Sequence, residues 1–152
     1  MATQVDRSSG ESDNTAALLR DAFAAIDRIV PRRLADRGHG AVRVAHGVVF
    51  QHLDEAGSTV STLAQRAGMT KQAMAALVQY LEGHGYLHRE PDPTDGRAKR
   101  VRLTPRGREV IAIARGLVPE LEGRLVKALG ASRWRALRDD LRTVREVFAE
   151  ER

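Results

Sequence analysis

A chain of 152 residues, 42% of them hydrophobic, has enough apolar side chains for one hydrophobic core, so one domain is expected. The formal net charge of +5 favours a negatively charged partner, although charge alone does not distinguish nucleic acid, membrane and acidic protein. The chain has no cysteine, which excludes disulfide bonds and thiolate metal sites. Residues 1–13 are expected to form a polar tail without a signal peptide, and no later run is apolar enough to span a bilayer, which predicts a cytoplasmic protein.

Two helices are predicted before residue 57. In residues 14–36 the apolar residues Leu19, Phe23 and Ile26 recur at helical spacing, which is typical of an amphipathic helix. Pro31 lacks a backbone N–H and is expected to kink or end this helix. The second helix follows the glycine-bracketed RGHG, ends near Asp54 to Gly57, and carries the apolar residues Val44, Val48, Val49 and Leu53.

The segment STVSTLAQRAGMTKQAMAALVQYLEGHGYL has the pattern of a helix-turn-helix. Ser61 is predicted to cap a short helix that runs through Ala67, and Gly68 permits a tight turn. Thr70 is predicted to cap a second helix that ends near Glu82. The apolar face of this second helix consists of Met74, Leu77, Val78 and Leu81, and the face left for a partner consists of Lys71, Gln72, Ala75, Ala76 and Gln79.

The segments YLHRE and KRVRL alternate like two strands of a β-hairpin, with Val101 and Leu103 inward and Arg100 and Arg102 outward. The connecting segment DPTDGRA is rich in turn-forming residues, and its carboxylates are expected to accept from nearby backbone donors. Residues 89–108 carry an excess of four positive charges, which is most of the net charge of the chain. A solvated surface is the ordinary explanation of such a run, but its position directly after a helix-turn-helix favours contact with DNA.

Two further helices are predicted after the hairpin. Thr104 is expected to cap the first, Pro119 to bend it and Gly130 to end it. The last helix begins at Ser132 and carries, at alternating steps of three and four, Trp134, Leu137, Leu141, Val144 and Phe148. This spacing is typical of a coiled-coil seam, which either pairs with a second copy of the chain or packs within one chain.

The segment STLAQRAGMTKQAMAALVQYLEGHGYLHREPDPTDGRAKRVRLTPRG resembles the MarR family of bacterial transcriptional regulators, and the residues that match the wing signature of that family are Asp95, Arg97, Leu103, Thr104 and Gly107. The resemblance implies a mainly α fold with a small β-hairpin wing, in one domain over residues 14–152. A winged helix-turn-helix would occupy residues 58–104, and dimerisation helices would occupy residues 14–36 and 105–152. The resemblance further implies an obligate homodimer that binds a pseudo-palindromic operator in double-stranded DNA and is often released by a small molecule.

The resemblance also implies that Arg97 enters a minor groove, where narrow A·T-rich stretches concentrate negative potential, and that Asp95 orients its guanidinium. On the polar helix face, Gln72 suits an adenine and Lys71 a guanine or a phosphate. Such residues are also ordinary on an exposed helix. The candidate DNA-binding residues are Ser61, Thr70, Lys71, Gln72, Ala75, Gln79, Asp95, Arg97, Lys99 and Arg100.

Arg43, His46 and Phe50 lie at steps of three and four on the second predicted helix and form a candidate effector site. A guanidinium beside an aromatic ring suits an aromatic or otherwise apolar acid. The alternative is that Arg43 pairs with an acidic residue across a dimer interface and that His46 and Phe50 are packing residues.

The chain contains no Gly-rich phosphate loop, no G-x-S-x-G and no H-E-x-x-H, so we expect no enzymatic activity, catalytic residue, cofactor or metal. The expected function is that of a ligand-responsive repressor that binds operator DNA as a homodimer. The alternative is a winged-helix module that binds another protein and no operator.

Overall fold

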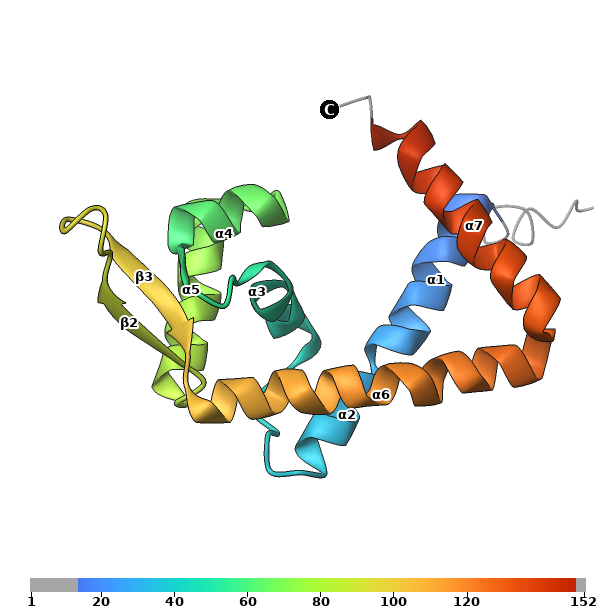
Figure 1. Ribbon diagram of the computed structural model, residues 1–152, viewed down its shortest axis with the longest axis horizontal. Coiled ribbons are helices and arrows are strands. Elements are labelled where there is room, and N and C mark those ends of the chain that lie inside the picture. The colour runs from blue at the N-terminus through green and yellow to red at the C-terminus, as the bar shows by residue number, and fades with distance from the viewer. Residues whose placement is uncertain (1–13, 150–152) are drawn as a thin grey trace, which may run out of the picture. The chain divides into compact units, whose positions relative to one another are not determined.

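A computed structural model describes residues 14–149 (Figure 1). The elements in chain order are α1 (Thr15–Asp27), α2 (Ile29–Ala35), the 3₁₀ turn η1 (Val44–His46), α3 (Gly47–His52), β1 (Ser58–Thr59), α4 (Val60–Ala67), α5 (Lys71–Gly83), β2 (Leu87–Pro91), β3 (Lys99–Leu103), α6 (Pro105–Leu129) and α7 (Ala131–Val147). Contacts divide the chain into two compact units, one up to Ala114 and one from Arg115. The mainly α fold with a small β wing is the fold that the sequence predicts.

The predicted first helix is divided into α1 and α2 at Arg28. Pro31 cannot donate to the Asp27 carbonyl, and its ring would clash with that carbonyl, so the first helix ends there. Pro31 then falls in the first turn of α2, where its missing N–H would have no partner within the helix anyway. The expected interruption is therefore confirmed, and it lies three residues before the proline.

The helix-turn-helix is formed by α4 and α5, as the sequence predicts. Its first cap differs, because Thr59, and not Ser61, accepts a hydrogen bond from the Thr62 N–H at 3.1 Å. Gly68 ends α4 in the left-handed conformation with φ of 63°, which glycine adopts without steric cost. Thr70 caps α5 by accepting from the Ala73 N–H at 3.2 Å.

The wing is a three-stranded antiparallel sheet in the order β1-β3-β2. Leu87 pairs with Leu103 at one end of the hairpin, and Pro91 pairs with Lys99 at the other. The sequence predicts β2 and β3 but not β1, because two residues are too few to show an alternating pattern. Just before β1, a Cβ on Gly57 would lie 2.7 Å from Arg102 Cγ, so only glycine lets the chain approach β3 this closely.

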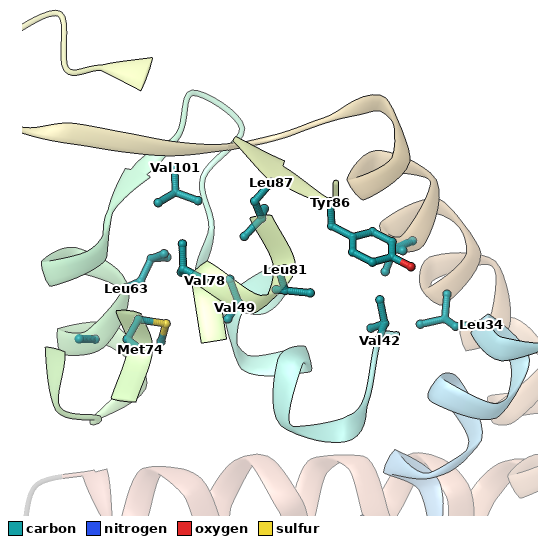
Figure 2. Close-up of a cluster of buried hydrophobic side chains, with 12 residues drawn as sticks. Leu34, Val42, Val49, Leu63, Met74, Val78, Leu81, Tyr86, Leu87 and Val101 are labelled. Atoms are coloured by element: carbon teal, nitrogen blue, oxygen red, sulfur yellow. The ribbon is translucent and has the colours of Figure 1, made fainter. Parts of the chain in front are cut away.

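One hydrophobic core holds the first unit together (Figure 2). The close-up shows side chains from α3, α4, α5 and both hairpin strands converging, among them Val49, Leu63, Met74 and Val101. Met74, Val78 and Leu81 are fully buried, so the inward face of α5 is the one that the sequence predicts. Because this face is anchored in the core, the opposite face of α5 is presented to solvent.

The helix α6 begins with Thr104 as its cap, whose Oγ1 accepts from the Gly107 N–H at 3.1 Å and donates to the Gly85 carbonyl at 2.6 Å. It continues as one helix through Pro119 to Leu129, and Gly130 separates it from α7 with φ of 82°. None of the helices within residues 14–149 is both long and apolar enough to cross a membrane.

Candidate nucleic-acid interface

The solvent face of α5 is polar at its N-terminal end. Lys71, Gln72 and Gln79 are exposed, whereas Ala75 is half-buried. The Thr70 hydroxyl is occupied as an acceptor by the cap, but its own hydrogen remains available to a phosphate. Ser61 is exposed near the start of α4, so it reaches solvent although it does not cap the helix.

The wing tip is organised around Asp92, whose side chain is only 7% exposed. Its Oδ1 accepts from the Thr94 N–H at 2.8 Å and from the Thr94 hydroxyl at 2.6 Å. Its Oδ2 accepts from Arg100 Nε at 2.7 Å. The hydrogen bonds from Arg100 and then from Thr94 hold the pKa of the Asp92 carboxyl well below its usual range, because they favour the ionised form.

Asp95 holds the backbone of Arg97 and not its guanidinium. Asp95 Oδ1 accepts from the Arg97 N–H at 3.0 Å, as a short carboxylate does in a tight turn. Within residues 14–149 the exposed Arg97 side chain has no ion-pair partner. The predicted orienting contact between Asp95 and the Arg97 guanidinium is therefore wrong for this structure.

The other arginines of the hairpin are paired with carboxylates. Arg89 Nε lies 3.2 Å from Glu82 Oε2, and Arg102 Nη1 lies 3.1 Å from Glu90 Oε1. Arg100 was expected to point outward, but its side chain is only 24% exposed because it bonds to Asp92. In the part of the chain that the structure describes, the exposed cations of the tip without such a partner are Arg97 and Lys99.

Arg43, His46 and Phe50 do not form one open face. Arg43 precedes η1 and is exposed, whereas Phe50 packs against the core. His46 is buried, and its Nδ1 accepts from the Arg43 N–H at 3.0 Å. Its ring stacks on Tyr80 of α5 with the centroids 4.6 Å apart, a contact that the sequence gives no sign of. Burial lowers the pKa of His46, and the charge of Arg43 and then that of His84 lower it further.

A cleft of about 400 Å³ lies elsewhere in the first unit. Its lining consists of Ala25, Arg28, Ile29, Arg32 and Val44. The sequence does not predict this cleft, because its lining combines Arg28 at the break between α1 and α2, Arg32 in α2 and the distant Val44. Two guanidinium groups beside aliphatic side chains suit an acid with an apolar body.

A helix-turn-helix with a polar solvent face, followed by a hairpin with exposed cations at its tip, is a winged helix-turn-helix, an arrangement typical of DNA-binding proteins. Residues 43–98 match the model of the MarR family. No curated protein matches the chain in sequence.

Several solved structures share the fold. The MarR family transcription regulator SP03579 is 23% identical, with a TM-score of 0.72 over 90% of this chain and 86% of that one. The transcriptional repressor CouR bound to a 23-mer DNA duplex is 23% identical, with a TM-score of 0.67 over 95% of this chain and 99% of that one. CouR from Rhodococcus jostii RHA1 bound to p-coumaroyl-CoA is 25% identical, with a TM-score of 0.67 over 90% and 95% of the two chains. These structures have the fold of the present chain, whose residues 43–98 match the MarR family model.

Proposed function

We propose that the chain is a ligand-responsive repressor that binds a pseudo-palindromic operator as a homodimer. The observation that carries this proposal is the exposed polar face of α5, which is followed in the chain by a wing whose tip presents Arg97 and Lys99. A dimer bound across a promoter would block transcription. The similar fold of CouR, a repressor bound to DNA, supports this sign of regulation.

The two parts of the interface have different roles in this proposal. Gln72 reads an adenine in the major groove, and the small side chain of Ala75 leaves room for a thymine methyl group. The other residues of the helix-turn-helix that contact DNA, mainly at phosphates, are Ser61, Thr70, Lys71 and Gln79. Arg97 enters the adjacent minor groove, Lys99 neutralises a phosphate, and Asp95 supports Arg97 through the backbone.

Homodimerisation is supported by exposed apolar side chains on the terminal helices. In α1, Phe23 is 62% exposed and Ile26 is 41% exposed. In the second unit, Leu137, Leu141 and Val144 share one face of α7 and are each more than a third exposed. Exposed apolar side chains that share a helix face are typical of protein interfaces.

The salt dependence of DNA binding tests the function. The probe is the best duplex selected from a random library, because selection also gives the half-site and its spacing. If a dimer neutralises about six to ten phosphates, log affinity falls with log salt at a slope of about −5 to −9. A slope near zero on this duplex, together with early elution from heparin, would support the protein-binding alternative instead.

An apolar acid is the effector class that the proposal includes. The site predicted from sequence, at Arg43, His46 and Phe50, is largely closed, because His46 is buried against Tyr80. The cleft at Arg28 and Arg32 offers open space and two cations, and it supports the same class of ligand. CouR bound to p-coumaroyl-CoA, a ligand whose acyl group is aromatic, is a neighbour in fold.

Screening aromatic carboxylates for release of the selected duplex tests both sites. If the cleft holds the acid, Arg28→Gln raises the concentration needed for release, whereas Arg43→Ala leaves it unchanged. The opposite result would show that the effector binds at Arg43 and not in the cleft. A ligand shifts DNA binding only through different affinities for the two states, so free and DNA-bound protein should also differ in affinity for the acid.

A further inference from the structure

We propose that Arg100 and Asp92 form a positioning pair that fixes the wing tip, and that Arg100 does not neutralise a DNA phosphate. This replaces the role of direct DNA contact that the sequence suggests for Arg100. The inference rests on the DNA-binding function proposed above, because the tip matters there as the support of Arg97.

The pair closes the tip at the point where the strand ladder ends. Pro91 and Lys99 are the last paired residues of β2 and β3, and the Asp92 N–H then donates to the Ala98 carbonyl at 3.0 Å. Asp92 Oδ2 reaches back to Arg100 on β3, while its Oδ1 accepts from the Thr94 N–H, the Thr94 hydroxyl and the Asp95 N–H. The Asp92 carboxylate, at the end of β2, therefore connects this strand to the turn and to β3.

Burial distinguishes this pair from its neighbours. The side chains of Arg100 and Asp92 are 24% and 7% exposed, whereas those of Arg102 and Glu90 are 42% and 35% exposed. If Arg100 turned towards a phosphate, the Asp92 carboxylate would lose the hydrogen bond from its cationic partner, which is unfavourable because this side chain has little contact with solvent. An exposed arginine exchanges its partner for a phosphate at little cost.

The consequence falls on Arg97. Its backbone is fixed by Asp95 Oδ1, and the Ala98 N–H donates to the Asp95 carbonyl at 2.9 Å. Since the Arg97 guanidinium has no ion-pair partner in the described residues, its direction depends on how rigid this backbone is. A tip that is already ordered leaves only the side chain of Arg97 to be ordered on binding DNA.

Amide hydrogen exchange in the DNA-free protein tests the pair itself. Arg100→Gln should accelerate exchange at Thr94, Asp95 and Ala98 by about tenfold, the effect of losing one charge-assisted hydrogen bond. Arg102→Gln is the matched control, because it removes an arginine and an ion pair from the same strand without touching the tip. Unchanged exchange in Arg100→Gln would overturn the proposal.

Salt dependence on the selected duplex tests the role in DNA binding. Arg100→Gln should weaken binding by about tenfold at every salt concentration with the slope of the wild type, whereas Arg97→Gln should make the slope shallower by about 2 per dimer. Asp92→Asn, which keeps the size of the side chain, should also weaken binding. If Asp92→Asn instead strengthens binding and steepens the slope, its loss has freed a phosphate-binding Arg100, and the positioning role is wrong. If the wild type itself shows no salt-dependent binding, the proposed function fails, and the exchange measurement still decides whether the pair fixes the tip.

Discussion

Arg97 and Arg100 lie in the same hairpin as Asp92 and Asp95, yet their guanidinium groups have different surroundings. Asp92 lies just beyond the ladder, where its side chain reaches across to Arg100, whereas Asp95 lies inside the turn and reaches only a backbone N–H. The sequence indicates the residues of the tip and its turn chemistry. It does not indicate which carboxylate meets which arginine, because that depends on strand register, and a slip of one residue would move every side chain of the strand to the other face of the sheet.

The first prediction concerns base reading by Gln72. Gln72→Ala should reduce discrimination at one base pair of each half-site by roughly 1–3 kcal/mol, because a bidentate contact with adenine is lost. Arg97→Ala should instead relax an A·T preference at the flanks of the site. The measurement is competition binding against duplexes with a single base pair replaced. If Gln72→Ala lost the same affinity for all duplexes, Gln72 would contact the DNA backbone and not a base.

The second prediction concerns pH and His46. Burial lowers the pKa of the folded His46 below its ordinary value of 6.5, so the unfolded chain binds a proton that the folded chain does not. The free energy of unfolding should therefore decrease as pH falls below about 6.5, and this residue should contribute no pH dependence above that value. Urea unfolding from about pH 8 to about pH 5 measures the effect. His46→Asn, which retains an acceptor for the Arg43 N–H, should flatten the curve, and an unchanged curve would show that another group titrates.

Secondary structure elements follow from sequence where their signals are local. The cap at Thr70, the left-handed Gly68 and the apolar face of α5 each depend on residues a few positions apart, and each is confirmed. The strand β1 and the stacking of His46 on Tyr80 depend on segments far apart in the chain. The contacts of β1 and His46 are determined by tertiary packing, which cannot be predicted from local periodicity.

Gly107, in the first turn of α6, shows how an element is positioned by close approach. A Cβ at this residue would lie 2.2 Å from the Tyr86 carbonyl oxygen and 3.0 Å from Leu103 Cδ2. The absence of a side chain therefore lets the start of α6 pack directly on the residue that precedes β2. This gives a physical reason for the glycine that the wing signature contains.

The third prediction is that Gly107→Ala destabilises the protein by about 1–3 kcal/mol, because the backbone of Tyr86 must move. Gly116→Ala is the matched control in the same helix, since a Cβ there meets nothing within 4 Å. That control should be stabilising by up to about 1 kcal/mol through helix propensity alone. Thermal or urea unfolding of both variants measures the difference. Equal stabilisation by the two alanines would show that the contact with Tyr86 relaxes freely.

For the whole molecule, charge and symmetry act together in the proposed function. The net charge is +5, of which residues 89–108 supply an excess of four, so the attraction for DNA is concentrated at the wing. A single wing and helix-turn-helix neutralise few phosphates. Two copies related by a two-fold axis double this number and contact two major grooves about 10 base pairs apart. Tight binding to the operator therefore depends on dimer formation.

The last prediction tests this relation through Leu141, which is 41% exposed on the apolar face of α7. In a symmetric dimer Leu141→Glu acts twice, and the loss of two buried leucines costs about 3 kcal/mol or more, so the dimer Kd should rise by more than a hundredfold. Thr143→Glu is the control, because it adds the same charge to another face of the helix. Sedimentation velocity should show monomer for Leu141→Glu and dimer for the control, and only the former should lose operator binding at low protein concentration. If Leu141→Glu remained a dimer that bound the operator, the face of α7 would be packing within one chain, and the two half-sites would be joined by another surface.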